Sequence, residues 1–324
     1  MDMTEQTVPK DYSVATQAVA CYSIPDAGYL LLSGETRREY VQRQTTNDID
    51  LLTTTRTLPD LLTSPNGRIL EFFTLLDLGD SIAILTQPGH GPGLAAYFQK
   101  RIFFNDKVAV QDQSTKWLQF EIHGPKAPVL LARFDFPTAP DLDKVLDAEW
   151  QGARIRALGQ LGFGANPRFL LIIPASHSAH VAARLSDIPT LSSGTREILR
   201  IESGHAGGPE FAAGATPFEL GLDRLISTTK GCYTGQEVLA RQVTYDKVVR
   251  RLVRLHAEKP LETGSTVLAD SKAVGQITSS AISPRLGPMA LGVVRKPYDA
   301  ENAELLVQHE GKQVTVTVMP SQTP

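Results

Sequence analysis

The pattern of secondary-structure signals changes near residue 247. Before that point, apolar runs typical of buried strands alternate with segments typical of helices, and after it the helical signal disappears. Short strand-like segments separated by Gly, Pro and Asp predict a small β-barrel or sandwich. Five such segments follow: Val248–Leu255, Thr266–Ala269, Ala273–Ser279, Met289–Val294 and Val314–Val318. We therefore expect an α+β domain at residues 1–243 and a barrel domain at residues 244–324.

The first part of the chain combines both kinds of signal. Short apolar runs bounded by Gly, Pro or polar residues predict strands, and a proline in a first turn or a glycine after a last turn marks the ends of helices. We expect strands at Ser81–Thr86, Trp117–Ile122 and Phe169–Ile173, and helices at Thr36–Asn47, Pro92–Gln99 and Ser193–Glu202. No long linker separates the two parts, so we expect them to pack as one body.

The composition is that of a folded, near-neutral protein. Hydrophobic residues make up 42% of the chain and charged residues 21%, and 32 Lys and Arg against 35 Asp and Glu give a formal charge of −3. This mix can fill a core and excludes a general polyanion binder. No apolar run approaches the roughly 20 residues that a membrane helix needs. Residues 1–11 lack the pattern of a secretory or mitochondrial signal, and two cysteines exclude a disulfide scaffold, so we expect a cytoplasmic protein without membrane contact.

The densest cluster of unusual residues is the segment KGCYTGQE at residues 230–237. Lys230 lies two positions before Cys232, and glycines on both sides of the cysteine permit close backbone approach. A thiol becomes more reactive beside positive charge, and more so if the helix expected to run to about Arg241 begins at this segment. A lone cysteine is otherwise more often a small buried hydrophobic residue. The spacing alone supports a functional thiol and a structural one about equally.

A second cluster surrounds the end of the helix expected at Ser193–Glu202. The helix dipole disfavours a carboxylate at this end, so Glu202 needs a partner. A structural partner would be Arg200 or another arginine. A functional partner would be a ligand with paired N–H donors, which a carboxylate accepts in bidentate fashion. Physical chemistry alone favours the ion pair for Glu202. The glycines that follow this residue do not form a nucleotide-binding fingerprint.

Residues 224–254 are locally basic. Seven Lys and Arg against Glu237 and Asp246 give this stretch a net charge of +5. Such a run is usually a solvated surface, although it also suits an anionic ligand tail or an RNA backbone. Metal and hydrolase sites have little support, because His177 and His180 lack a third ligand and no nucleophile-elbow motif occurs.

The segment at residues 230–237 resembles the K-G-C-[FY]-x-G-Q-E signature of the YgfZ-type folate-binding proteins, which are relatives of the glycine-cleavage T-protein, an aminomethyltransferase. Weaker similarities occur in the family's order along most of the chain. They are LSGETRREYVQRQTTND at 32–48, SPNGRIL at 64–70, residues 200–210 with PFELGLDR at 217–224, GQITSSAISP at 275–284 and LGVVR at 291–295. The chain is identified as a member of this group.

This resemblance implies a fold and a role. The fold is an α+β folate-binding body of two related halves, divided near residue 113, with a C-terminal antiparallel β-barrel that closes a central folate channel. The role is tetrahydrofolate-dependent maturation or repair of iron–sulfur proteins and, through them, tRNA modification. The expected partners are a reduced folate, iron–sulfur client or assembly proteins and, as a candidate contact, tRNA.

The resemblance also assigns roles to residues. Glu202 would hold the pterin ring of tetrahydrofolate or of a one-carbon derivative, and Cys232 would be the functional thiol, as a nucleophile or as a transient sulfur or iron ligand. The remaining cofactor-binding candidates are Lys230, Tyr233, Gln236 and Arg241. No metal site is implied.

One position departs from the T-protein branch. There a catalytic aspartate stands in a D-D pair after a turn, whereas GRILEF at residues 67–72 places Glu71 at the first aspartate and has no second. Glutamate is one methylene longer, and proton transfer tolerates small displacements poorly. Two alternatives stay open: a folate-dependent aminomethyl- or methyltransferase of the T-protein type, and a non-enzymatic RNA- or protein-binding module that uses residues 224–254. Whether the chain is an enzyme also stays open.

Overall fold

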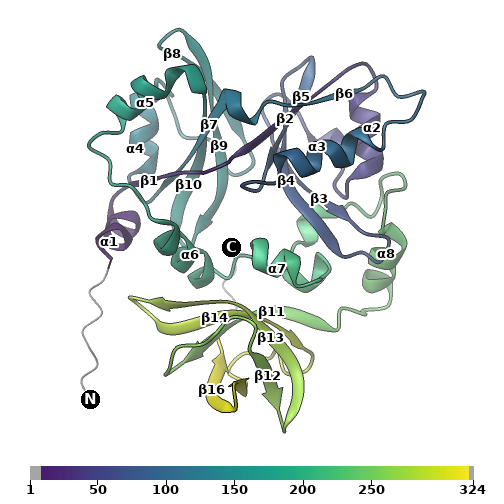
Figure 1. Cartoon of the computed structure of the whole chain (residues 1–324), viewed down its shortest axis with the longest axis vertical. Coiled ribbons are helices and arrows are strands. Elements are labelled where there is room, and N and C mark those ends of the chain that lie inside the picture. Colours follow the sequence, from purple (N-terminus) through teal and green to yellow (C-terminus); the bar gives the residue numbers. More distant parts are fainter. Residues whose placement is uncertain (1–8, 321–324) are drawn as a thin grey trace.

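The protein consists of two β-sheets with their helices and a separate barrel, joined by helical segments between them (Figure 1). The computed structural model describes residues 9–320. The expectation that residues 1–11 hold no targeting signal falls mostly outside this range. Within it, no helix is long and apolar enough to cross a membrane.

The first sheet is antiparallel, with the strand order β3-β4-β5-β2-β6. Two helices, α2 and α3, cover one of its faces and share a core with it that includes Leu30, Phe73 and Phe98. The strands are β2 (Gly28–Ser33), β3 (Leu58–Thr63), β4 (Ile69–Asp77), β5 (Ser81–Thr86) and β6 (Ala109–Asp112), and the helices are α2 (Arg37–Gln44) and α3 (Gly91–Gln99).

The second sheet is also antiparallel, with the order β1-β7-β10-β9-β8. Its outer face packs against α4 and α5 around Ile122, Leu131 and Trp150. The strands are β1 (Ala20–Ser23), β7 (Trp117–His123), β8 (Val145–Trp150), β9 (Ala153–Phe163) and β10 (Asn166–Pro174), and the helices are α4 (Ala127–Leu131) and α5 (Ser178–Arg184). Because β1 joins this sheet, the N-terminal segment contributes to the second sheet as well as to the first. The division into halves near residue 113 remains a prediction.

The inner faces of the two sheets pack against each other. Tyr29 and Leu85 of the first sheet share a buried cluster with Leu170 and Ile172 of the second. The Tyr29 ring also stacks on Trp117 with the ring centroids 4.9 Å apart. Strands that are buried on both faces need apolar residues at successive positions. This explains why the segments expected at Ser81–Thr86 and Phe169–Ile173 are continuous apolar runs, and both predicted strands are confirmed.

The C-terminal part is a closed antiparallel barrel with the order β11-β14-β13-β12-β15-β16. This confirms the α+β class with a C-terminal β-barrel and removes the sandwich alternative. Strand β15 was not among the predicted strands, although Leu305 and Val307 alternate into the barrel core. The strands are β11 (Arg250–Ala257), β12 (Thr266–Ala269), β13 (Lys272–Ser283), β14 (Gly287–Arg295), β15 (Glu304–His309) and β16 (Lys312–Val318).

Among residues 9–320, four α-helices lie outside the two sheets and the barrel: α1 (Lys10–Gln17), α6 (Ser193–Glu202), α7 (Gly208–Ala212) and α8 (Gln236–Thr244). The buried guanidinium of Arg200 ties α6 and α7 to the barrel. It pairs with Glu210 of α7 at 2.7 Å and with Glu197 at 2.6 Å, and it donates to the hydroxyl of Ser279 on β13 at 2.7 Å. Arg200 is therefore committed to these groups and is not the partner of Glu202.

Candidate functional site

Cys232 lies in an exposed loop immediately before α8. The helix begins at Gln236, inside the segment at residues 230–237, so the thiol precedes its first turn. Both cysteines are free, and they differ in setting. Cys21 is buried, and burial raises the pKa of its thiol to about 12. Cys232 is thus the thiol that a partner in solution can reach.

Lys230 holds the start of this loop against the segment that follows α2. Its ammonium group is buried and donates to the carbonyl of Thr45 at 2.9 Å and to the carbonyl of Asn47. Burial lowers the pKa of Lys230 to about 8, and the fully buried carboxylate of Asp60 opposes that shift. Lys230 therefore stabilises the loop and does not present its charge to the thiol.

The same contacts explain why α2 ends earlier than expected. The helix predicted to reach Asn47 stops at Gln44. The backbone N–H groups of Thr46 and Asn47 donate instead to one oxygen of Asp60, at 3.0 and 2.8 Å. A side-chain acceptor that takes these N–H groups replaces the helical hydrogen bonds.

The other end of the loop rests on the β3–β4 hairpin. The hydroxyl of Thr63 donates to the carbonyl of Thr234 at 2.6 Å. Gly235 has φ +87°, and a Cβ there would lie 2.5 Å from the carbonyl oxygen of Ser64. Glycine is therefore required at residue 235. Gln236 donates to the carbonyl of Lys230 at 3.3 Å and closes the loop around Cys232.

Tyr233 is buried beneath the loop. Its ring centroid lies 5.4 Å from the ammonium nitrogen of Lys230, and burial raises the pKa of its phenol to about 12. Lys230, Tyr233 and Gln236, which were predicted to bind the cofactor, thus contact the loop itself. Their part in cofactor binding stays a prediction.

Glu202 is buried at the end of α6. One carboxylate oxygen accepts from the hydroxyl of Tyr12 on α1 at 2.8 Å and from the hydroxyl of Ser283 on β13. The other oxygen pairs with the guanidinium of Arg285 at 3.3 Å. The compensating partner expected for this carboxylate is therefore Arg285, with two hydroxyl groups.

Glu202 and Cys232 belong to different sides of the joining region, with α7 between α6 and α8 (Figure 1). Side chains around α7 form an apolar cluster with the first sheet and the barrel, in which the central residues are buried and the outer ones are partly buried. The rings of Phe72 and Phe211 stack there with centroids 5.7 Å apart. Other members of this cluster are Ala206, Leu222, Ile226 and Leu252.

Glu71 on β4 pairs with the ring of His90 at 2.6 Å. Burial raises the pKa of the Glu71 carboxyl, and the hydrogen bond from His90 opposes this effect. The position that corresponds to the first aspartate of the D-D pair is thus a half-buried carboxyl group with an imidazole partner, and the neighbouring Phe72 belongs to the apolar cluster around α7.

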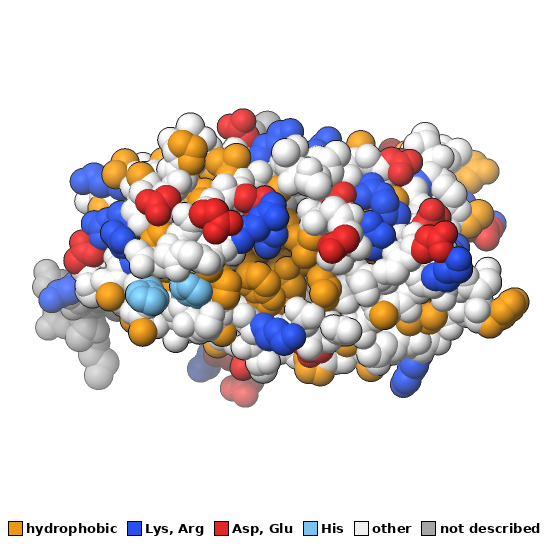
Figure 2. Space-filling view, turned by 90° about the horizontal axis from the view of Figure 1, so that it is seen from above, with side chains coloured by type: hydrophobic (Ala, Val, Ile, Leu, Met, Phe, Trp, Pro, Cys, Tyr) orange, Lys and Arg blue, Asp and Glu red, His pale blue; other side chains and the backbone are white. Residues whose placement is uncertain are grey.

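Most of the basic stretch at residues 224–254 is committed to other groups of the protein. Arg241 is exposed on α8 and pairs with Glu237 at 2.5 Å, so its role in a channel stays a prediction. On the face away from the barrel, acidic and basic side chains are interspersed (Figure 2). The other engaged residues are Arg224 with Asp143, Arg250 with Glu219, Arg251 with Asp299, Arg254 with the carbonyls of Glu202 and Pro320, and buried Lys230.

Three partners in these contacts had no signal in the sequence. Tyr12 lies 190 positions from Glu202, and His90 lies 19 positions from Glu71. Asp60 lies within β3 and has no feature in the sequence that marks it as a partner. In the part of the chain that the structure describes, no group of three or more His, Cys, Asp or Glu residues could hold a metal ion.

Comparisons with known proteins match the chain over nearly its whole length. A model of the GCVT N-terminal domain matches residues 2–230, and a model of the glycine cleavage T-protein C-terminal barrel domain matches residues 250–323. An aminomethyltransferase of Desulforamulus reducens is 24% identical over an alignment of 337 positions, which covers 98% of this chain and 90% of that protein.

A chloroplastic protein of Arabidopsis thaliana, whose name describes it as a transferase, is 27% identical over 276 residues. The match covers 83% of this chain and 63% of the plant protein, which is less than two thirds of its length. The crystal structure of the glycine cleavage system aminomethyltransferase T from Bartonella henselae has a TM-score of 0.84 at 19% identity, over 96% of this chain and 88% of that one, which shows a common fold. The chain belongs to the family of the glycine cleavage T-protein, with a GCVT N-terminal domain followed by the C-terminal barrel domain.

Proposed function

We propose that the chain binds tetrahydrofolate or a one-carbon derivative and supports the maturation or repair of iron–sulfur proteins, as a YgfZ-type member of the T-protein family. The observation that carries the proposal is the setting of Cys232. Lys230, Tyr233, Thr234 and Gly235 all fix the loop, while the thiol itself is exposed. A cysteine kept only for packing would be buried, as Cys21 is.

The apolar cluster around α7 supports binding of a flat ring. Ligand sites combine apolar and aromatic walls with a few polar groups, and Phe72 and Phe211 supply the aromatic surface. Glu202 would orient a ring through N–H donors. Because Tyr12 and Ser283 occupy one of its oxygens, bidentate acceptance requires at least one of these hydroxyl groups to move away.

A folate-dependent aminomethyl- or methyltransferase is the second candidate. It draws support from relatives named as aminomethyltransferases and from the carboxyl group of Glu71, whose pKa is raised and whose partner is His90. A general acid or base works best with a pKa near the operating pH. Purified protein that transfers no aminomethyl group to tetrahydrofolate, with Glu71→Gln unchanged in every assay, would exclude this candidate.

The partners and the place of action belong to the same proposal. Iron–sulfur client or assembly proteins would meet Cys232, the cytoplasm would be the compartment, and effects on tRNA modification would follow from iron–sulfur enzymes. Direct tRNA contact through residues 224–254 has less support, because ion pairs within the protein take up most of that charge.

Calorimetric titration with 5-formyltetrahydrofolate tests the folate part of the proposal. We expect the wild type and Cys232→Ser to bind the folate and Glu202→Ala to lose binding. Absence of binding to the wild type would refute this part.

Restoration of iron–sulfur enzyme activity in a deletion strain tests the thiol. Cys232→Ser should fail, whereas Cys21→Ala, the matched control at the buried cysteine, should restore activity. Full restoration by Cys232→Ser would refute a chemical role for the thiol.

A further inference from the structure

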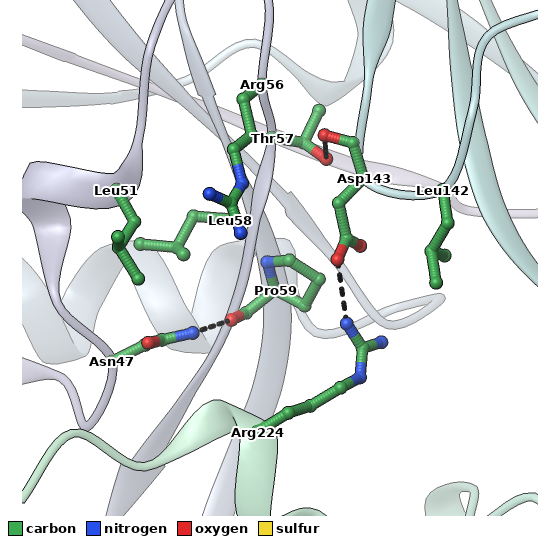
Figure 3. Close-up of a pocket in the computed structure, with 9 residues that line it drawn as sticks. All are labelled: Asn47, Leu51, Arg56, Thr57, Leu58, Pro59, Leu142, Asp143 and Arg224. Carbon is green, nitrogen blue, oxygen red and sulfur yellow. Dashed lines mark hydrogen bonds and ion pairs between the residues drawn. The ribbon is translucent and has the colours of Figure 1, made fainter.

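A pocket of about 220 Å³ lies where the two sheets meet. Its walls come from three separate parts of the chain (Figure 3). Asn47 and Leu51 follow α2, Arg56 to Pro59 enter β3, and Leu142, Asp143 and Arg224 come from the second half and the joining region. None of the six residues predicted to be catalytic or cofactor-binding lines this pocket, whereas Arg224, the first residue of the basic stretch at residues 224–254, does.

The charges in the pocket leave one guanidinium free. Arg224 pairs with Asp143 at 2.8 Å across the lower wall. Arg56 projects into the pocket between these walls (Figure 3) and makes no ion pair or side-chain hydrogen bond with residues 9–320. With Asp143 already neutralised, the pocket carries one uncompensated positive charge with several N–H donors. A guanidinium binds planar carboxylates through paired hydrogen bonds.

Apolar surface flanks this guanidinium. Leu51 and Leu142 are 43% and 46% exposed, although both are large aliphatic residues. They lie on opposite sides of the pocket, with Arg56 between them in this view (Figure 3). Leu58 and Pro59 also line the pocket, and both are buried. Exposed aliphatic side chains beside a free guanidinium match a ligand with a flat apolar part and an acidic group.

The walls are fixed to each other by backbone hydrogen bonds. The N–H of Thr57 donates to the carbonyl of Asp143 at 2.9 Å, and the N–H of Val145 donates to the carbonyl of Thr55 at 3.1 Å. The pocket is therefore formed before any ligand enters, which lowers the entropic cost of binding.

We propose that this pocket binds a small aromatic carboxylate, with its ring between Leu51 and Leu142 and its carboxylate on Arg56. Two sources have this chemistry: a free benzoate-type acid, and the aminobenzoyl-glutamate part of a folate whose pterin lies elsewhere in the protein. The second source rests on the proposed folate function, and the first does not.

Calorimetric titration with p-aminobenzoyl-glutamate tests the pocket directly. We expect the wild type to bind this probe and Arg56→Gln to bind it about tenfold more weakly, which corresponds to about 1.4 kcal/mol. Leu51→Ser should also weaken binding through loss of apolar contact. Arg184→Gln, at an exposed arginine on α5, is the matched control and should bind as the wild type does. Equal affinity in wild type and Arg56→Gln, or no binding to the wild type, overturns the proposal.

Titration with 5-formyltetrahydrofolate distinguishes the two sources. If Arg56→Gln weakens binding of both probes, the carboxylate in the pocket belongs to a folate. If the wild type binds p-aminobenzoyl-glutamate in an Arg56-dependent way and binds no folate, the pocket takes a free acid and the folate function fails. If the folate binds equally to wild type and Arg56→Gln while p-aminobenzoyl-glutamate binding depends on Arg56, the pocket again takes a free acid and the folate function stands.

Discussion

Replacing Arg200 by methionine tests the junction between the body and the barrel. The guanidinium joins Glu197, Glu210 and Ser279, which lie on α6, α7 and β13. Methionine preserves much of the side-chain volume and removes all of the donors. Glu210 is fully buried, so Arg200→Met leaves a buried carboxylate without its cation.

The expected cost follows from this burial. Removing one partner of a buried ion pair costs about 3 to 5 kcal/mol. The lower end applies here, because Ser279 and the N–H of Gly207 still donate to Glu210 at 2.6 and 2.8 Å. Unfolding entropy is about 2.1 cal/mol/K per residue, so for a chain of this length a loss of about 3 kcal/mol lowers the melting temperature by about 4 °C.

Scanning calorimetry measures this shift, with Arg184→Met on α5 as the control that should change the melting temperature by less than about 1 °C. Adding Glu210→Gln to Arg200→Met removes the uncompensated charge and should recover about half of the loss. A shift below about 1 °C in Arg200→Met, or a further loss in the double variant, would refute the reasoning.

Three further predictions concern the loop and the titrating groups. Gly235→Ala should destabilise the protein by more than about 1 kcal/mol, because of its positive φ and the carbonyl 2.5 Å from a new Cβ. Gly231→Ala, which has open space, should stay within about 0.5 kcal/mol in the same urea titration. Burial lowers the pKa of Lys230 to about 8, so between about pH 8 and 10.4 the unfolded state binds more protons than the folded state. The free energy of unfolding of the wild type should therefore rise with pH in that window, relative to that of Lys230→Met. If the urea midpoints of the wild type and Lys230→Met changed with pH in the same way, this prediction would be contradicted. Burial raises the pKa of Glu71, so its contribution is present at low pH and is lost as pH rises through the folded pKa. Glu71→Gln should therefore gain stability relative to wild type as the pH rises above about 4, where a glutamate of the unfolded chain ionises. Thermal midpoints of the two proteins that show no such gain would contradict this prediction.

Local patterns in the sequence predicted most elements that have a clear period or clear ends. The helix at Ser193–Glu202 and the strands at Ser81–Thr86 and Thr266–Ala269 have the predicted bounds. Predictions were less accurate where a distant group replaces a local hydrogen bond. The helix expected to end at Asn47 stops three residues earlier because Asp60 takes the N–H groups beyond it.

The candidate site likewise has features that local sequence shows and features that depend on distant contacts. The cysteine segment was recognisable because its residues are consecutive. Its geometry depends on Thr45, Thr63 and Asn47, which lie more than 170 positions from the residues that they contact. The structural partner of Glu202 was expected to be Arg200 or another arginine. It is Arg285, because the buried Arg200 is held by Glu210.

The order of the elements, the change from α+β to all-β structure and the cysteine segment can be read from neighbouring residues. Four features arise only when the chain folds: Lys230 points inward, Cys232 is exposed, Tyr12 and Arg285 hold Glu202, and Arg56 lies free in a pocket between the sheets. These outcomes depend on which buried donors and acceptors meet when the sheets and the barrel pack. A buried polar group takes the partner that the packing brings near it, whatever their separation along the chain.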